Sequence, residues 1–121
     1  QLGDGRDDRV TDAALAVDRV ARHIHDHYNR PLTVEELVEV GGLSQGYLAR
    51  VFKQQYGCTM QRFALHRRVE VASQLLQSTR MPIKRIAAEA GFNQLEYFHR
   101  QFRAITGRTP GQMRASHRRE P

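Results

Sequence analysis

The sequence has very little cysteine and no long apolar run. Cys58 is the only cysteine among 121 residues, so neither an intrachain disulfide nor a cysteine-based metal site can form. No stretch approaches the roughly 18 apolar residues that a membrane-spanning helix requires, and no signal-peptide pattern is present. These absences favour a reducing compartment, so we expect a cytoplasmic protein without membrane contact.

Patterns typical of strands and of enzymes are also missing. No glycine-rich phosphate loop is present, and Glu70 and Glu89 have no second carboxylate close in sequence. His23 and His27 are four residues apart in "RHIHDHY", but two helical histidines without a third ligand make a weak metal site. We expect a solvated helix face there. The sequence therefore predicts no enzyme, no metal site and no cofactor, with a nuclease as a distant alternative.

Basic residues are unevenly distributed along the chain. Residues 1–30 contain five Arg and six Asp, whereas residues 31–121 contain 14 Lys and Arg against seven Glu. We expect the basic part to be folded and to bind a polyanion. Residues 1–10 are polar and begin with Gln1 rather than Met, which suggests a fragment cut at a linker. Residues 117–121 are expected to form a basic tail.

Apolar residues recur at helical spacing and predict an all-α fold of about seven helices. The clearest stripe lies in the first helix and comprises Val17, Val20, Ala21, Ile24 and Tyr28. The expected helices cover residues 12–28, 34–40, 45–56, 60–77, 82–90 and 94–105, followed by a short last helix from Pro110. Pro82 is expected as a first helical residue. The expected N-caps are Thr33, Ser44, Thr59, Asn93 and Thr109.

The chain also contains an internal repeat. With an offset of 49, the segment from Val34 to Gln45 matches the segment from Ile83 to Gln94. After a one-residue insertion the offset is 50, and matched pairs include Tyr47 with Tyr97, Leu48 with Phe98, Arg50 with Arg100, Phe52 with Phe102, Lys53 with Arg103 and Gly57 with Gly107. Each copy is a short helix, a glycine turn and a longer basic helix. This order predicts a helix-turn-helix, whose second helix lies in the DNA major groove.

Two such units are predicted, over residues 11–57 and 80–116, with a linker helix within residues 58–79. A linker helix of about 18 residues spans about 27 Å. This length is comparable with the roughly 34 to 36 Å between successive major-groove faces of B-DNA. We therefore expect two recognition helices in adjacent grooves of double-stranded DNA. The alternative is a basic helical adaptor domain that docks on an acidic protein partner.

The run "IKRIAAEAGFNQLEYFHRQFRAITGRTPGQMR" resembles the signature of the AraC/XylS transcription regulators. It contains the IA, GF, YF, R-x-F-[KR] and G-x-[ST]-P elements of that signature, and the linker helix supplies the R-x-x-x-A-x-x-L-L run through Arg68, Ala72, Leu75 and Leu76. The likeness extends over about residues 11–116. The phrases "LEYFHRQF" and "GRTPGQMR" are similar to the xylose-regulator branch. Met113 occupies a place where the family often has Tyr, and we expect it to be a packing substitution.

The resemblance implies the C-terminal DNA-binding domain of a bacterial regulator, acting at the nucleoid. Its implied partners are promoter DNA, RNA polymerase and an effector ligand bound by a further N-terminal domain. It places most of the expected DNA-contacting residues on the two recognition helices. The expected set is Ser44, Gln45, Gly46, Tyr47, Ala49, Arg50, Lys53, Asn93, Gln94, Leu95, Glu96, His99, Arg100 and Arg103.

Individual roles within this set leave alternatives open. Arg50 and Arg100 can pair with guanine O6 and N7 or anchor phosphate, and Glu96 can accept from cytosine N4 or be an exposed helix-start charge. Lys53 and Arg103 are expected nearer phosphate.

Small residues and aromatic residues divide the remaining roles. Gly46 and Ala49 offer few atoms to bases, so we expect the first unit to rely on Arg50 and backbone contacts. Tyr47 and Tyr97 could stack on sugar, but their shared repeat position favours packing. Phe92, Phe98 and Phe102 are expected to hold the second recognition helix to the scaffold.

Overall fold

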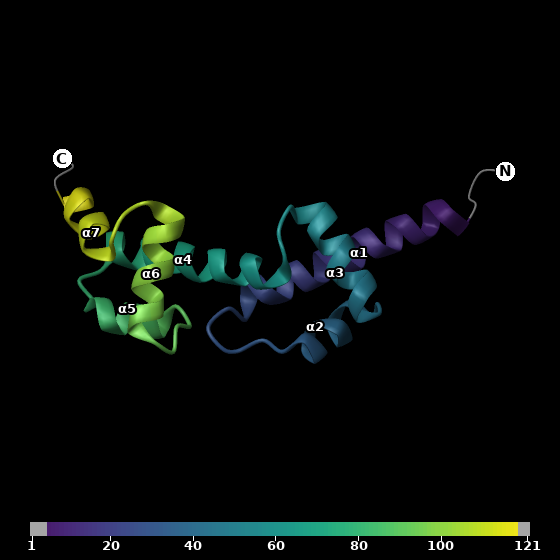
Figure 1. Ribbon diagram of the computed structural model, residues 1–121, viewed down its shortest axis with the longest axis horizontal. Helices are drawn as coiled ribbons and strands as arrows, with labels where there is room; N and C mark the ends of the chain where they lie inside the picture. Colours follow the sequence, from purple (N-terminus) through teal and green to yellow (C-terminus); the bar gives the residue numbers. More distant parts are fainter. Residues whose placement is uncertain (1–4, 119–121) are drawn as a thin grey trace. The chain divides into compact units, whose positions relative to one another are not determined.

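The computed structural model describes the backbone of residues 5–118 and the side chains of residues 12–116; within this range every regular element is helical (Figure 1). The helices are α1 (Gly5–Asp26), α2 (Val34–Gly41), α3 (Gln45–Tyr56), α4 (Met60–Ser78), α5 (Ile83–Glu89), α6 (Leu95–Thr106) and α7 (Pro110–Arg118). The predicted all-α class with seven helices is confirmed. Over the same residues, no helix combines the length and apolar character needed to cross a membrane.

The chain folds into two compact units. Of the described residues, the first unit contains 5–27 together with Leu32–Ala64. The second unit contains Tyr28–Pro31 and residues 65–118. The first unit therefore holds α1, α2 and α3, and the second holds α5, α6 and α7, while the residues of α4 are divided between them.

The core of the first unit is built on one face of α1. Val17, Val20 and Ile24 are fully buried there, as the predicted stripe requires, and they pack with Leu48 and Phe52 of α3. Further core residues are Ala21, Leu37 and Ala64. Burial of each valine, leucine, isoleucine or phenylalanine side chain in this core stabilises the fold by about 1.5 to 3 kcal/mol before entropy is counted, which fixes α3 against α1.

The core of the second unit forms around α6. Phe98 and Phe102 are fully buried, and Phe92, from the turn before α6, is 7% exposed. The ring centroids of Phe92 and Phe98 are 5.0 Å apart, and those of Phe98 and Phe102 are 5.5 Å apart. These contacts confirm that the three phenylalanines hold α6 to its scaffold. The remaining core residues come from α4, α5 and the α5–α6 turn: Leu65, Val69, Val71, Ala72, Leu76, Ile86, Ala87 and Ala90.

Hydroxyl side chains start four helices, as predicted. Thr33 Oγ1 accepts from the Glu36 N–H at 3.1 Å, and Ser44 Oγ accepts from the Tyr47 N–H at 3.4 Å. The corresponding distances are 3.1 Å from Thr59 Oγ1 to the Arg62 nitrogen and 3.0 Å from Thr109 Oγ1 to the Gln112 nitrogen. Each bond satisfies a backbone donor that has no partner within its helix.

Three expected helix starts are wrong. α1 begins at Gly5 rather than Asp12, because the apolar stripe used to place it lies further along and a polar helical turn carries no such signal. Pro82 is the N-cap of α5 instead of its first residue. α6 begins at Leu95, and its N-cap is Gln94 rather than Asn93. The C-terminal ends of the first six helices lie within two residues of those expected.

The shifted start of α6 corrects the register of the repeat. Ser44 and Gln94 are both N-caps and lie 50 residues apart, whereas the turn glycines Gly42 and Gly91 lie 49 apart. The inserted residue therefore lies before α6, in the turn at Asn93. Gln94 consequently corresponds to the cap Ser44 and not to Gln45.

Candidate nucleic-acid interface

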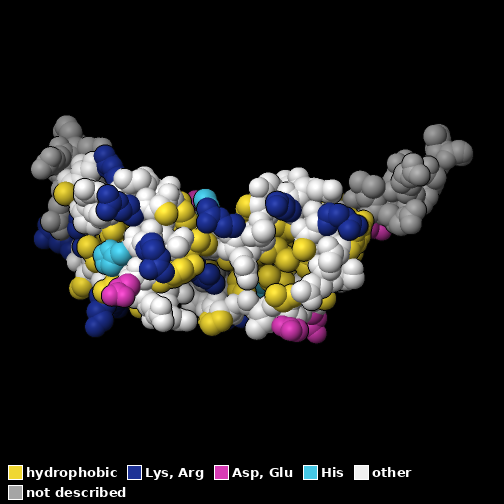
Figure 2. All heavy atoms as spheres, viewed as in Figure 1, with side chains coloured by type: hydrophobic (Ala, Val, Ile, Leu, Met, Phe, Trp, Pro, Cys, Tyr) yellow, Lys and Arg dark blue, Asp and Glu magenta, His cyan; other side chains and the backbone are white. Residues whose placement is uncertain are grey.

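α3 and α6 each bury one face and expose the other. Leu48 and Phe52 of α3 are 0% exposed, and so are their counterparts Phe98 and Phe102 of α6. Exposed basic side chains lie between each buried pair, at Arg50 and Arg100, and directly after it, at Lys53 and Arg103. Figure 2 shows Lys and Arg side chains exposed over both units. The buried pair therefore fixes one side of each helix to the core of its unit and leaves a basic side facing solvent.

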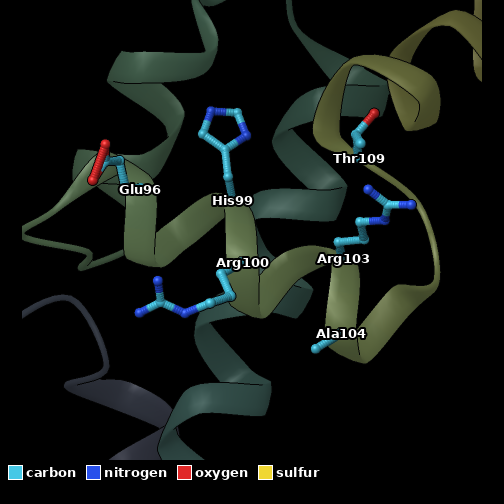
Figure 3. Close-up of a pocket in the computed structure, with 6 residues that line it drawn as sticks. All are labelled: Glu96, His99, Arg100, Arg103, Ala104 and Thr109. Atoms are coloured by element: carbon cyan, nitrogen blue, oxygen red, sulfur yellow. The ribbon is translucent and has the colours of Figure 1, made fainter.

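A shallow hollow lies along the exposed face of α6. Its lining residues are Glu96, His99, Arg100, Arg103, Ala104 and Thr109 (Figure 3). Arg100 and Arg103 point to opposite sides, and Arg103 extends toward Thr109 at the start of α7. The hollow thus offers two guanidinium groups, one carboxylate and one imidazole. These groups can donate to guanine or phosphate and accept from cytosine.

Each basic face carries the same arginine–tyrosine pair. The guanidinium carbon of Arg50 lies 5.2 Å from the centroid of the Tyr47 ring. In α6 the guanidinium carbon of Arg100 lies 5.6 Å from the centroid of the Tyr97 ring. Both distances fall within the roughly 6 Å range of a cation–π contact. The two helices therefore share an element of side-chain geometry as well as a sequence pattern.

The residues predicted to contact DNA lie on α3, on α6 and at their N-terminal turns. Thirteen of them are exposed, namely Ser44, Gln45, Gly46, Ala49, Arg50, Lys53, Asn93, Gln94, Leu95, Glu96, His99, Arg100 and Arg103, and Tyr47 is half-buried. The expectation that packing accounts for both repeat tyrosines is wrong for Tyr97, which is 39% exposed. Its ring centroid lies 6.2 Å from that of Phe92, at the edge of the core.

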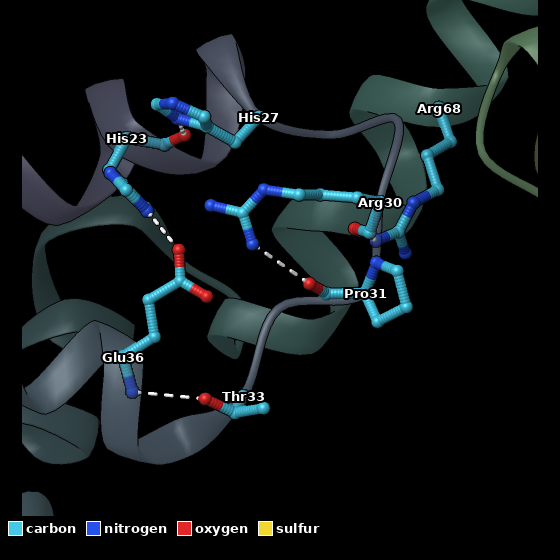
Figure 4. Close-up of polar contacts among 7 residues, drawn as sticks. All are labelled: His23, His27, Arg30, Pro31, Thr33, Glu36 and Arg68. Carbon is cyan, nitrogen blue, oxygen red and sulfur yellow. Dashed lines mark hydrogen bonds and ion pairs between the residues drawn. The ribbon is translucent and has the colours of Figure 1, made fainter.

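Some arginines serve the scaffold, which the sequence did not indicate. Arg68 Nε donates to the Tyr28 carbonyl at 2.7 Å. Arg68 Nη2 donates to the Arg30 carbonyl at 3.2 Å, and Figure 4 shows these two arginines. Burial lowers the pKa of the Arg68 guanidinium, and the Tyr97 hydroxyl acts in the opposite direction. Arg68 thereby fixes the Tyr28–Pro31 segment in the second unit.

Arg114 of α7 has a similar role at the end of α4. Its Nη2 donates to the carbonyls of Met81 at 2.7 Å and Thr79 at 3.3 Å, and its Nε donates to Leu76 at 3.4 Å. These acceptors lie 33 to 38 residues away in sequence, so no local spacing reveals the contact. A cation at a helix C-terminus is favourable for the helix dipole. Met113 packs against the same core, in agreement with its expected role.

His23 of α1 and His27, which directly follows that helix, also contribute to structure. His23 Nε2 and Glu36 Oε2 are 2.5 Å apart, and His27 Nδ1 lies 2.9 Å from the His23 carbonyl oxygen (Figure 4). The two rings stack at 4.2 Å. The expected solvated helix face is therefore wrong for His23, which links α1 to α2. Across the described residues, no group of three or more metal-ligating side chains is present.

Known proteins share this arrangement. A family model described as "Helix-turn-helix domain" matches residues 37–116. An uncharacterized HTH-type transcriptional regulator, YfiF of Bacillus subtilis, is 34% identical over 105 residues, which cover 87% of this chain and 33% of that protein. The chain spans about a third of the length of the first curated relatives that it matches.

Solved structures show the same fold. The C-terminal domain of AraT, a response regulator from Geobacillus stearothermophilus, matches with a TM-score of 0.78 and 33% identity, covering 84% of each chain. The xylose-binding transcription activator XylR matches with a TM-score of 0.75 and 28% identity, covering 84% of this chain and 27% of that one. The expected likeness to a xylose regulator is thus found beside likeness to a response regulator. The two helix-turn-helix units, their signature residues and these matches together establish that the chain belongs to the AraC-type helix-turn-helix DNA-binding domains of transcriptional regulators.

Proposed function

We propose that the chain binds double-stranded promoter DNA through α3 and α6, which act as recognition helices in successive major grooves. The observation that carries this proposal is the pair of exposed basic faces on α3 and α6, each set opposite two fully buried side chains. A helix that is fixed on one side and basic on the other suits insertion into a groove lined by phosphates. Because the units run in the same chain direction, the predicted site is nonpalindromic.

The residues divide by expected role. Arg100 and Glu96 are placed for base edges, because both line the hollow and lie in the first half of α6. Lys53 and Arg103, one turn further along their helices, are placed for phosphate. The first unit offers only Arg50 as a long side chain near the centre of its face, since Gly46 and Ala49 flank it. Sequence preference is therefore expected to be weaker in the first half of the site.

A binding assay on the whole chain tests this function. A duplex selected by the chain from a randomised library serves as the specific probe, and an unselected duplex serves as the comparison. Arg100→Ala is expected to cost about 1 to 3 kcal/mol on the selected duplex and to relax base preference at one position. Arg22→Ala, an exposed arginine of α1, is the control and should leave that preference unchanged.

Salt dependence separates DNA binding from the adaptor alternative. Affinity for DNA should fall steeply as salt rises, because phosphate contacts release counterions. If no duplex is enriched by selection, and affinity stays flat between low and moderate salt, the DNA-binding proposal is wrong. Binding to an acidic protein would then be the function to pursue.

We further propose that the chain is the output domain of a longer, effector-responsive regulator that acts with RNA polymerase. The chain covers only 33% and 37% of two of its relatives, which supports the presence of further domains in such proteins. Transcription in vitro from a promoter bearing the selected site, with and without the chain, tests the polymerase part. An unchanged transcript level at saturating protein would contradict it.

A further inference from the structure

Tyr47 and Tyr97 occupy one place in the repeat, yet core packing does not account for both. Tyr97 is 39% exposed and Tyr47 is half-buried, while the next residue in each helix, Leu48 or Phe98, is 0% exposed. A large aromatic ring on a solvent-facing helix side leaves apolar surface exposed to water, which is unfavourable. Its recurrence in both units points to a role on that face.

Both rings lie beside an arginine three residues further along. This spacing places the two side chains on one side of a helix. The guanidinium carbons lie 5.2 Å from the Tyr47 centroid and 5.6 Å from the Tyr97 centroid. The neighbouring residues on these faces differ between the units, with Gly46 and Ala49 in α3 against Glu96 and His99 in α6. The tyrosine–arginine pair is retained while its surroundings change.

The buried side of the Tyr97 ring lies beside a phenylalanine of the core. It lies 6.2 Å from the ring of Phe92, which is 7% exposed and packs at 5.0 Å against the buried Phe98. A ring that packs against a buried side chain has a fixed orientation. It therefore restricts the rotamers of an arginine that contacts its exposed side. An unrestrained arginine has many rotamers and can contact phosphate on any sequence, whereas a restrained one is prepared for a single base edge.

We propose that Tyr47 and Tyr97 are positioning residues, which hold Arg50 and Arg100 in the orientation needed to read a base. This inference rests on the proposed DNA-binding function. The tyrosines then contribute sequence discrimination and add little to general affinity for DNA. The contact requires the aromatic face and not the hydroxyl group, so Phe can replace Tyr at either position.

The test is a double-mutant cycle on the second unit of the whole chain. The probes are the duplex selected by the wild-type chain and an unselected duplex of equal length. Tyr97→Leu is expected to lower the ratio of specific to nonspecific affinity about threefold to tenfold, the effect of losing one cation–π contact. Tyr97→Phe should keep the wild-type ratio. In an Arg100→Ala background, Tyr97→Leu should change the ratio no further, because it acts through that arginine.

Two further measurements separate positioning from structural support. The salt slope of Tyr97→Leu should match that of the wild type, because phosphate contacts remain. Its thermal midpoint should stay close to the wild-type value, because leucine keeps an apolar side chain beside Phe92. The inference is overturned if Tyr97→Leu keeps full discrimination, if it weakens binding to both duplexes equally with a lowered thermal midpoint, or if its effect adds fully to that of Arg100→Ala. If the wild-type chain selects no duplex at all, the DNA-binding function itself fails instead.

Discussion

The two units place the same elements around different turns. In the first unit, Gly42 follows α2 with φ of 72°, and its N–H donates to the Val38 carbonyl at 2.8 Å. In the second, Gly91 has φ of 99° and donates to the Ala88 carbonyl at 3.0 Å, while the Phe92 N–H donates to the Ala87 carbonyl at 2.9 Å. This pair of bonds is the Schellman arrangement, whereas the single bond at Gly42 is the simpler αL motif.

The surroundings of the two glycines differ even more. A Cβ at Gly91 would lie 2.6 Å from the Tyr28 carbonyl oxygen and 3.0 Å from the Asn29 Cα. A Cβ at Gly42 would meet no neighbouring atom of the described chain within 4 Å. The first turn therefore needs glycine for its backbone angle alone, while the second also needs it for close approach. The same turn of the repeat is therefore expected to tolerate a side chain better at Gly42 than at Gly91.

The largest expected effect comes from the turn glycines. Gly91→Ala should destabilise the protein by about 2 to 4 kcal/mol, because positive φ and a backbone clash act together. Gly42→Ala should cost about 1 to 2 kcal/mol, from its positive φ alone. Denaturant unfolding measures both values. Equal losses would show that the Tyr28–Pro31 segment moves aside without cost.

The N-caps of the recognition helices give a smaller contrast. Ser44→Ala removes the hydroxyl that accepts from Tyr47, and should cost about 1 kcal/mol. Gln94 makes no side-chain cap bond in the described structure, so Gln94→Ala should change stability by less than about 0.5 kcal/mol. Gln94→Ser should stabilise the protein instead. Unfolding midpoints of the three variants check the order, and a loss at Gln94→Ala matching that at Ser44→Ala would contradict it.

Two helical glycines allow a matched test on the exposed surface. Gly46 and Gly111 are each the second residue of a helix, and a Cβ at either meets no neighbouring described atom within 4 Å. Both Gly46→Ala and Gly111→Ala should therefore stabilise the fold by about 0.4 to 1 kcal/mol. Thermal melting measures the gain. A loss of stability at Gly46 alone would reveal a constraint on α3 that α7 lacks.

The smallest expected effect is a pH dependence confined to the first unit. Burial raises the pKa of Tyr56 to about 12, aided by the hydrogen bond from its hydroxyl to Asp18 at 2.6 Å and by the charge of Asp18. Gln55 and Arg22 act in the opposite direction. The repeat places Thr106 at the equivalent position of the second unit.

The sign follows from linkage. The folded state holds the Tyr56 proton more tightly than the unfolded chain, so this contribution to stability is complete below pH 10 and is lost as the pH rises toward about 12. Tyr56→Phe should flatten the fall in unfolding free energy over that range. An identical slope in the wild type and in Tyr56→Phe would contradict the prediction. Tyr56 is only partly buried, with 36% of its surface exposed, so solvent screening keeps the effect small.

Local chemistry decided which parts of the fold could be predicted. The side-chain hydroxyls of Thr33, Ser44 and Thr59 cap helices by accepting from a backbone N–H three residues further along. Because both partners are close in sequence, such caps can be predicted from residue spacing. The start of α6 was missed because Asn93 resembles a cap while Gln94 occupies the position. Exposed residues of α3 and α6 were predictable because the buried pairs at four-residue spacing fix the opposite face.

Long-range contacts explain what the sequence did not reveal. Arg68 and His23 have partners 40 and 13 residues away, and those of Arg68 are backbone carbonyls that any sequence would offer. The tyrosine–arginine pairs were present in the repeat, but the exposure of Tyr97 depends on how Phe92 fills the core beneath it. Packing at the edge of a core is a tertiary property and has no periodic signature.

The contacts of Arg114 set a limit on how far the C-terminus can be shortened. A shorter chain that retains Arg114 would keep the donor for the Leu76, Thr79 and Met81 carbonyls. A chain that stops before it would leave these acceptors to solvent and would fray the last turn of α4. A shortened chain must therefore retain the guanidinium group of Arg114 to keep the end of α4 bonded to α7.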